Sequence, residues 1–231
     1  MSATLTVTRA GPLATIQDSG RFGMLRNGIS RSGPMDHGAY DASGRLAGAG
    51  GSGIEFTTAG IDLRVDAGAC RVGFAGGHFI AEHNGRQLDW PGSASLAQGD
   101  MLAITPGKWG NYGYLRFDGD LDIPPVLGSV ATNSRVALGG LAGRSLRAGD
   151  SLKLVGKGSA ATFAVEMVGP DQSPIRVIWG LHADLFPQAL REHFVESSFT
   201  ISTRLDRMGV RLEDPYGVFN GASILSLVSD A

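Results

Sequence analysis

Short apolar runs, separated by polar and glycine-rich stretches, dominate the first two thirds of the chain. Residues 4–8 alternate apolar and polar side chains, which predicts a strand. Further strands are predicted at residues 13–16, 54–57, 61–65, 70–75, 79–82, 101–105, 112–117 and 151–155. Turn signals such as Asn84-Gly85 and Pro106-Gly107 stand between these runs. Short strands at this spacing are typical of a β-barrel or a β-sandwich.

A helix is predicted at residues 35–47. Its apolar residues recur near one helical face, and Pro34 suits the start of a helix. The glycine-rich residues 48–53 follow the helix and are expected to end it. A phosphate-binding loop would instead lie between a strand and the start of a helix, so we interpret these glycines as a helix stop.

The composition changes near Gly169-Pro170, and we expect one lobe at residues 1–168 and a second at residues 169–231. Both lobes are predicted to be rich in β-structure. In the second lobe the predicted strands are residues 175–179, 199–203 and 222–228. A short helix is predicted at residues 182–192, where Pro187 is acceptable only in the first turn or at a kink.

Two turn sequences resemble each other. Residues 96–102 read Leu-Ala-Gln-Gly-Asp-Met-Leu, and residues 146–152 read Leu-Arg-Ala-Gly-Asp-Ser-Leu. Each places Gly-Asp ahead of an apolar strand. The similarity indicates either a common type of β-turn, which is the interpretation we favour, or two equivalent corners of one barrel.

Composition and charge exclude several classes of function. The chain has 231 residues, of which 42% are hydrophobic. Its net charge of −2 gives no excess of positive charge that would indicate binding to nucleic acid or to an anionic membrane. No apolar run approaches the roughly 20 residues of a membrane span, and the first residues lack a signal peptide. Cys70 is the single cysteine, and its place in a predicted strand indicates a buried, inert thiol. We therefore expect a soluble, cytoplasmic protein.

The sequence predicts no metal site. His78 and His83 could be ligands if they share a hairpin, but we favour the interpretation that both are ordinary surface histidines. The chain contains neither a Walker-type phosphate loop nor a Gly-x-Ser-x-Gly nucleophile elbow.

Two clusters of Asp, Arg and Gly are the candidates for chemistry. The candidate site residues are Asp18, Arg21 and Asp36 in the first cluster, and Asp206 and Arg207 in the second. Arginine offers a forked donor for carboxylate, phosphate or ureido oxygens, and aspartate can orient that donor or accept a proton. The alternative, which spacing alone favours, is that Asp–Arg pairs hold loops to the barrel. Chemistry requires the two clusters to meet in one cavity.

Several segments, in order from about residue 4 to residue 212, resemble one known family. They include Gln17-Asp-x-Gly-Arg-x-Gly23, Ser32-Gly-x-Met-Asp36, Glu55, Pro124-Pro-Val-Leu-Gly-Ser129, Gly139-Gly-Leu-x-Gly-Arg144, Leu146-x-x-Gly-Asp150 and Asp206-Arg-Met-Gly-x-Arg-Leu212. Together they resemble the allophanate hydrolase subunit 2 family, also called the biotin-dependent carboxyltransferase family. That family includes the C-type component of bacterial 5-oxoprolinase, an antagonist of a sporulation-kinase inhibitor, and part of the carboxyltransferase domain of urea carboxylase.

The resemblance implies a mainly β fold with cyclophilin-like barrel architecture and two short helices. It implies a cytoplasmic hetero-oligomer, in which this chain acts with a subunit 1 homologue and in some systems with a third subunit. The implied activity is an ATP-dependent amide or lactam hydrolase, like 5-oxoprolinase, or a related carboxyltransferase. ATP or biotin would take part through the complex, and the substrate would be a small molecule with an amide, lactam or ureido group.

Under this hypothesis the five candidate residues line the pocket. Arg21 and Arg207 would hold the oxygen or carboxylate of the ligand, and Asp18, Asp36 or Asp206 would orient them or act as base. A second hypothesis is a non-catalytic protein that binds a subunit 1 homologue and regulates it. A third, a stand-alone peptidyl-prolyl isomerase, rests on fold analogy alone.

The sequence also departs from the family pattern. His78 stands where the family commonly has Asp, and Leu205 replaces a small polar residue. The family continues into a further β segment with an Arg-x-Thr-x-Gly-Gly-Tyr-type motif, which this sequence does not contain. The resemblance therefore implies a shortened member or a fragment, and this favours the non-catalytic hypothesis.

Overall fold

The structure is a computed structural model that describes residues 2–48, 51–156, 165, 173–207 and 209–220. The chain divides into two compact units, Met1–Asp171 and Gln172–Ala231. Among the described residues, no helix combines the length and the apolar character that crossing a membrane requires.

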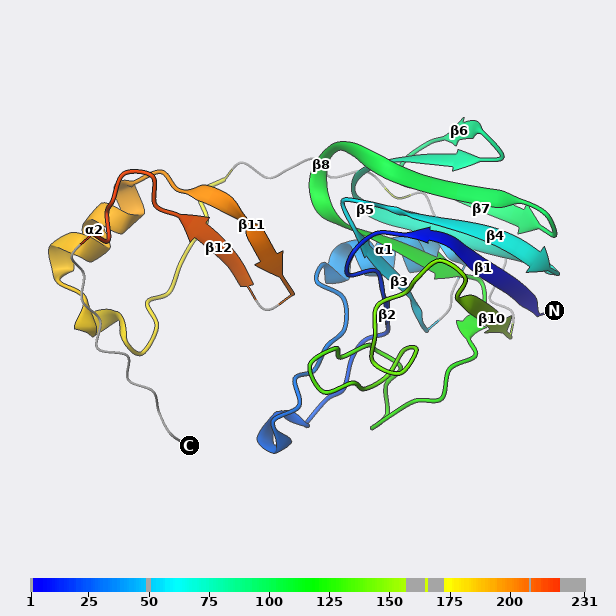
Figure 1. Cartoon of the computed structure of the whole chain (residues 1–231), viewed down its shortest axis with the longest axis horizontal. Helices are drawn as coiled ribbons and strands as arrows, with labels where there is room; N and C mark the ends of the chain where they lie inside the picture. Colours follow the sequence, from blue (N-terminus) through cyan, green and yellow to red (C-terminus); the bar gives the residue numbers. More distant parts are fainter. Residues whose placement is uncertain (1, 49–50, 157–164, 166–172, 208, 221–231) are drawn as a thin grey trace. The chain divides into compact units, whose positions relative to one another are not determined.

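Ten strands of the first unit form one strongly curled sheet (Figure 1). They are β1 (Ala3–Ala10), β2 (Thr15–Gln17), β3 (Gly53–Thr57), β4 (Ile61–Ala67), β5 (Ala69–His83), β6 (Arg86–Leu88), β7 (Gly92–Ala97), β8 (Met101–Phe117), β9 (Asp120–Leu121) and β10 (Ser151–Val155). The strand order is β2-β3-β8-β4-β1-β10-β9, and β5 pairs with β6, β7 and β8. All of these pairings are antiparallel. The mainly β, barrel-like fold with two α-helices is thus confirmed.

Two strands are longer than the sequence pattern predicted. The predicted strands at residues 70–75 and 79–82 are both parts of β5, and those at 101–105 and 112–117 are both parts of β8. The register of this pair shifts on both sides of His78. A Cβ at Gly77 would lie 2.8 Å from the Gly110 Cα, so the backbones approach each other as only glycine allows. Gly77 and Gly110, which stand between predicted strands, therefore lie inside two long paired strands at an irregularity of their register.

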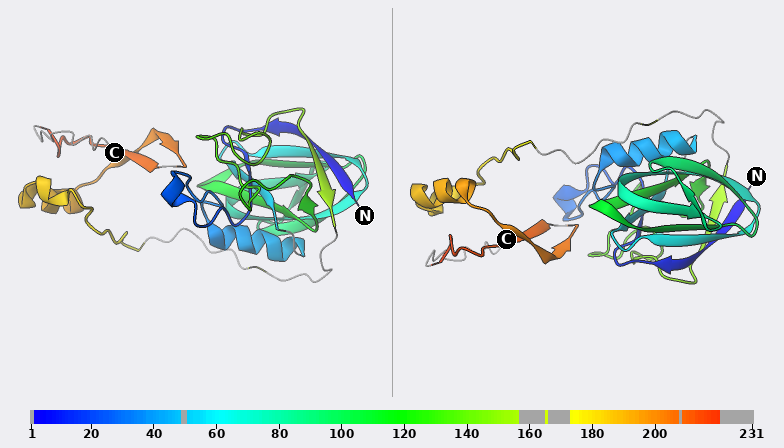
Figure 2. Two further views of the ribbon diagram at one scale, coloured as in Figure 1. Left: turned by 90° about the horizontal axis from the view of Figure 1, so that it is seen from below. Right: turned by 90° about the horizontal axis from the view of Figure 1, so that it is seen from above.

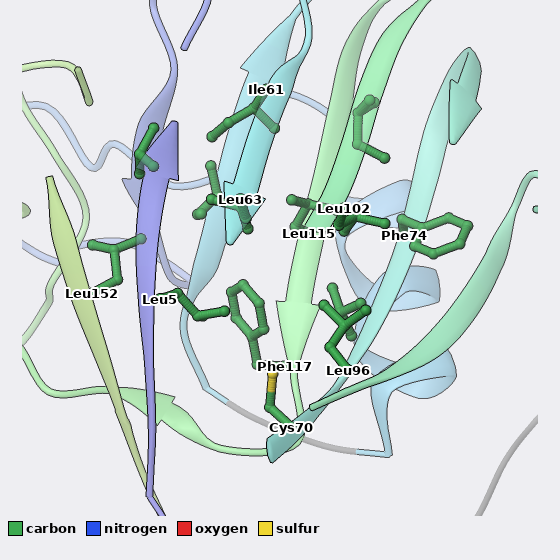
Figure 3. Close-up of a cluster of buried hydrophobic side chains, with 14 of the residues drawn as sticks. Leu5, Ile61, Leu63, Cys70, Phe74, Leu96, Leu102, Leu115, Phe117 and Leu152 are labelled. Carbon is green, nitrogen blue, oxygen red and sulfur yellow. The ribbon is translucent and has the colours of Figure 1, made fainter. Parts of the chain in front are cut away.

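The hydrophobic core fills the interior of this curled sheet (Figure 3). Leu5, Phe74, Leu115 and Phe117 come from different parts of the chain, and each has an exposed fraction of 0%. Because successive strand residues point to opposite faces, the alternating patterns direct these side chains inward. Cys70 belongs to the same cluster and is buried, as predicted.

Helix α1 (His37–Ala47) packs along the curled sheet, against β5 and β8 (Figure 2). It begins two residues later than predicted, because Asp36 is its N-cap and accepts a hydrogen bond from the Ala39 N–H at 2.9 Å. Gly48, with φ of 90°, ends the helix as predicted. A Cβ at Gly73 of β5 would collide with the backbone of Ser43, so the helix can approach the sheet only over glycine.

The two Gly-Asp turns are built alike. Gly99 donates its backbone N–H to the Val65 carbonyl, and Gly149 donates its own to the Val7 carbonyl, each at 2.8 Å. In both turns the Asp carboxylate accepts the backbone N–H three residues earlier, again at 2.8 Å. Their φ angles of 91° and 93° suit glycine. The Asp contacts are those of one common turn type, and the Gly contacts place each turn against a strand of the sheet, so both interpretations stay open.

The second unit contains η2 (Ala183–Leu185), α2 (Gln188–Glu196) and an antiparallel hairpin of β11 (Thr200–Asp206) and β12 (Gly209–Glu213). The helix predicted at residues 182–192 is wrong in its bounds, because Pro187 separates two helical segments and is the N-cap of α2. Five aromatic side chains pack here by ring contacts, namely Trp179, Phe186, Phe194, Phe199 and Phe219.

The strand predicted at residues 175–179 is wrong. This stretch is irregular, and Ile175 and Ile178 have exposed fractions of 91% and 97%. Its apolar, β-branched residues favour a strand, but a strand also requires a partner, and the described residues supply none. The strand predicted at residues 222–228 lies outside the described residues.

Candidate functional site

Two long loops of the first unit lie side by side (Figure 1). The first loop, residues 18–36, connects β2 to α1 and contains the short helix η1 (Leu25–Asn27). The second loop, residues 122–150, connects β9 to β10. The first Asp/Arg cluster lies in the first loop, so the contacts between these two loops decide what its residues do.

Asp18 joins the two loops. Its Oδ1 accepts a hydrogen bond from the Ser129 hydroxyl at 2.6 Å, and its Oδ2 accepts one from the Val130 N–H at 2.7 Å. The same Oδ1 accepts the N–H of Gly20 at 2.8 Å. Hydrogen bonds to an ionised carboxylate are strong, so Asp18 holds both backbones in register.

Arg21 joins the same two loops from the interior, with an exposed fraction of 1%. Its Nε donates to the Val126 carbonyl at 3.0 Å, and its Nη2 donates to the Ser129 carbonyl at 3.2 Å. Burial lowers the pKa of Arg21, and the charge of Asp18 partly opposes that shift. Its Nη1 is buried and has no hydrogen-bond partner in the described part of the chain.

Asp36 is part of a buried chain of hydrogen bonds as well as the N-cap of α1. Its backbone N–H donates to the Tyr114 hydroxyl at 2.7 Å, and that hydroxyl donates to Glu55 Oε2 at 2.9 Å. The same Glu55 oxygen accepts the Met35 N–H at 2.8 Å. Glu55 and Tyr114 are both 0% exposed, and burial raises the pKa of the Tyr114 hydroxyl. These contacts fix the end of the first loop against β3 and β8.

A second tyrosine extends this polar network. The Tyr40 hydroxyl lies 3.0 Å from the Gln17 carbonyl and 2.9 Å from the Gly51 carbonyl. The Arg116 guanidinium stacks 4.2 Å from the centroid of the Tyr40 ring, a cation–π contact. The rings of Tyr40 and Tyr114 meet edge to face at 5.8 Å.

Sequence reasoning assigned no role to Glu55, Tyr114, Tyr40 or Arg116. Glu55 was identified only as part of the family resemblance, but one signal indicated a role for it: it is a charged residue between Ile54 and Phe56 in a predicted strand. A carboxylate in such a place must have donors around it, because burying an unpaired charge is costly.

The second cluster lies in the second unit, at the turn between β11 and β12. The backbone of Asp206 pairs with that of Gly209 at the end of the hairpin. Burial lowers the pKa of Arg207 to about 10. Because the clusters belong to different units, their meeting in one cavity stays a prediction, as do the ligand-binding roles of all five candidate residues.

One cavity of the first unit is lined by none of the five candidate residues. It measures about 290 Å³ and lies beside Cys70, Arg71, Leu96, Asp118 and Leu154. Two nitrogens of the Arg71 guanidinium already have protein partners, because Nε donates to the Leu46 carbonyl and Nη2 donates to the Ser93 hydroxyl.

The histidines that could have been metal ligands have protein partners. His78 Nδ1 accepts the Lys108 N–H at 3.1 Å, and His83 Nε2 lies 3.0 Å from Asp100 Oδ2. Over the described residues, no three His, Cys, Asp or Glu side chains are placed together to hold a metal ion.

Comparison with known proteins gives consistent matches over most of the chain. The family model described as carboxyltransferase domain, subdomain A and B, matches residues 27–230. The C-type component of 5-oxoprolinase from Escherichia coli (strain K12) is 31% identical over 216 residues, which cover 90% of this chain and 68% of that protein. The chain therefore spans about two thirds of the length of that relative.

Solved structures share the fold. The K. lactis urea amidolyase superposes with a TM-score of 0.75 at 26% identity, over 92% of this chain and 14% of that chain. The protein TTHA0988 superposes with the same TM-score of 0.75 at 29% identity, over 92% of this chain and 42% of that chain. A family model that matches residues 27–230, a relative at 31% identity and this shared fold lead to one conclusion: the chain belongs to the carboxyltransferase domain family, subdomains A and B.

Proposed function

We propose that this chain is a subunit of an ATP-dependent enzyme system related to 5-oxoprolinase, and that it acts beside a subunit 1 homologue. The observation that carries this proposal is the 31% identity to the C-type component of 5-oxoprolinase over 90% of the chain. The substrate would be a small molecule with an amide, lactam or ureido group, which a guanidinium can bind through its oxygen. A variant of this proposal is that the system is a related carboxyltransferase, and the structural similarity to urea amidolyase supports this variant.

Two arginines are the proposed ligand-binding groups. Arg21 keeps one buried nitrogen, Nη1, without a hydrogen-bond partner among the described residues, and a substrate oxygen would satisfy it. Arg207 would act from the turn of the second unit, with Asp206 beside it in the sequence. In this proposal Asp18 and Asp36 act mainly by positioning the first loop, since their carboxylates accept backbone N–H groups.

The glycine-rich stretch at residues 48–53 does not fit a nucleotide phosphate. It follows the C-terminal end of α1, whose partial negative charge disfavours an anion. A carboxylate is already there, because Asp120 Oδ1 accepts hydrogen bonds from the backbone N–H groups of Gly51 and Ser52. We therefore do not propose residues 48–53 as a nucleotide site, and in this proposal ATP or biotin takes part through the complex.

The test is an assay of the whole complex. The chain is purified with its subunit 1 homologue and the third subunit, and 5-oxoproline-dependent ATP hydrolysis is measured. We expect Arg207→Ala and Arg21→Lys each to lower kcat/KM at least tenfold, as loss of a charge-assisted hydrogen bond predicts at about 1.4 kcal/mol or more. Arg86→Ala, which removes an exposed arginine from β6, is the matched control. Full activity in both site variants would overturn the site assignment.

A second candidate function is a non-catalytic regulator of a subunit 1 homologue. The observation that favours it is structural: Asp18 and two of the three guanidinium nitrogens of Arg21 hold the loops together, and the Asp36 carboxylate caps α1. This function predicts a stable complex without turnover. It also predicts that the complex still forms when Arg207 is replaced by Ala. Affinity capture of the tagged chain, combined with the ATPase assay, separates the two functions.

A further inference from the structure

Charge is distributed unevenly between the two loops and the rest of the chain. Residues 19–35 and 123–149 contain six of the chain's 20 Lys and Arg residues, all of them arginines. The same two stretches contain none of its 22 Asp and Glu residues. The complete loops, residues 18–36 and 122–150, also contain Asp18, Asp36, Asp122 and Asp150 at their ends, so their six arginines leave them a net charge of +2, whereas the rest of the chain has 14 Lys and Arg against 18 Asp and Glu.

Four of these six arginines are exposed. Arg21 is buried between the loops, and Arg144 forms a salt bridge of 2.7 Å with Asp150. The exposed ones are Arg26, Arg31, Arg135 and Arg147. The aspartates lie only at the ends of the two loops, so the four exposed guanidinium groups between them attract negative charge.

Large apolar side chains are exposed in the same loops. Phe22 and Leu25 have exposed fractions of 63% and 78%, and Leu127 of the second loop has one of 49%. The guanidinium of Arg31 stacks 4.0 Å from the centroid of the Phe22 ring. Aromatic residues together with arginine are the composition that recurs at the centres of protein–protein interfaces.

The contacts between the loops place the stretches that contain these residues side by side. Arg21 donates a hydrogen bond to Val126, and the next residues in the two loops are Phe22 and Leu127. The hydrogen bond from Asn133 to Ser30, at 3.1 Å, lies next to Arg31 and close to Arg135. We name the set formed by Phe22, Leu25, Arg26, Arg31, Leu127 and Arg135 the arginine face.

The arginine face is held in shape but open to its surroundings. Leu127 and Ala137 adopt φ angles of 53° and 52°, which residues with a Cβ rarely do unless the surrounding structure enforces them. A Cβ built at Gly23 or Gly28 would meet no atom within 4 Å, so the chain around η1 extends outward. A projecting surface of this kind is better suited to bind the surface of another protein than to bind a small anion, which needs a concave site.

We propose that the arginine face docks an acidic surface patch of the partner protein, with Phe22 and Leu25 entering its apolar centre. This rests on the proposed function, because the occupant to which we commit is the subunit 1 homologue. The charge complementarity predicts that association is fast at low salt and weakens as salt screens the arginines.

The test measures binding of the purified subunit 1 homologue to the immobilised full chain. The double variant Arg26→Glu plus Arg135→Glu reverses two exposed charges whose side chains make no hydrogen bond or salt bridge in the described structure. We expect it to raise Kd at least tenfold and to flatten the salt dependence. Leu25→Ala tests the apolar part and is expected to raise the dissociation rate about threefold to tenfold. Arg86→Glu on β6, which makes the same change of charge at one exposed site instead of two, is expected to leave Kd within twofold of the wild type.

The outcomes separate this inference from the proposed function. If the wild-type chain binds and the double variant binds equally well, the arginine face is not the docking surface, whereas the proposed function stands. If the wild-type chain does not bind the subunit 1 homologue at all, the proposed function and this inference fail together. An equal loss of binding in Arg86→Glu would indicate a general charge effect and would also overturn the inference.

Discussion

Single side chains with several hydrogen bonds determine the shape of the first loop. Asp18 and Ser129 are 111 positions apart in the sequence, and Arg21 and Val126 are 105 apart. The sequence pattern identified Asp18 and Arg21 as residues of interest, but it could not predict partners at this distance. Hydrogen bonding to a carboxylate or a guanidinium leaves no periodic signal, unlike the burial of apolar side chains.

Asp18→Ala is expected to destabilise the first unit by about 2–4 kcal/mol, because it leaves the donors of Ser129, Val130 and Gly20 without their acceptor. Urea denaturation followed by circular dichroism measures the change. Asp41→Ala, on the exposed surface of α1, is the control and is expected to change stability by less than about 0.5 kcal/mol. An unchanged midpoint for Asp18→Ala would contradict the bracing role.

Cys70 is expected to resist thiol reagents in the folded protein. Burial raises the pKa of its thiol to about 12, with the charge of Asp118 adding to the shift. The reactive thiolate is therefore scarce at pH 8, and labelling by DTNB should be slow until urea unfolds the chain. Because the folded pKa is raised, the contribution of this group to stability is complete below pH 9 and is lost as pH rises toward 12. Rapid labelling of the native protein would contradict this burial.

At the scale of elements, the sequence predicted where apolar strands lie better than it predicted which turn signals separate two strands and which lie inside one strand. The Asn84-Gly85 hairpin is confirmed, since His83 pairs with Arg86 across it. Pro106-Gly107 gives a similar local signal but lies within β8. The difference is tertiary: β5 runs beside this segment and supplies hydrogen bonds that keep it extended. Local turn chemistry cannot reveal whether such a neighbour exists.

Gly73→Ala is expected to destabilise the protein by about 2 kcal/mol or more, since a Cβ would collide with the backbone of Ser43 and Ala47 and push α1 away from β5. Gly38→Ala, in helix α1, is the matched control for Gly73→Ala in β5, because the added Cβ would meet only Asp36 Oδ1, at 3.4 Å. That variant should be neutral or stabilising by up to about 1 kcal/mol, as alanine favours helix. Thermal unfolding of both variants measures the difference, and equal melting temperatures would contradict close packing of helix on sheet.

At the scale of the whole molecule, the two units differ in how much apolar surface they bury. All residues of the main hydrophobic cluster lie between Ala3 and Leu154, within the first unit. Among the residues of the second unit whose burial is described, which leave out residues 172, 203–206, 208, 210 and 221–231, Val218 is the single buried apolar residue. Both regions contain similar apolar runs, which is why a strand was predicted at residues 175–179 as readily as in the barrel. Sequence patterns could not reveal which of these runs would find partners.

This difference predicts that the first unit folds without the second. A chain of residues 1–171 keeps its complete hydrophobic cluster, so it should retain the β-sheet spectrum and a cooperative urea transition close to that of the full chain. Residues 172–231 alone expose Ile175, Ile178 and Leu181 almost fully and should show no cooperative transition. Circular dichroism of both fragments, with the full chain as control, measures this. If residues 1–171 lost their cooperative transition, the barrel would depend on the second unit for its stability, and the first loop could not be treated as a preformed surface.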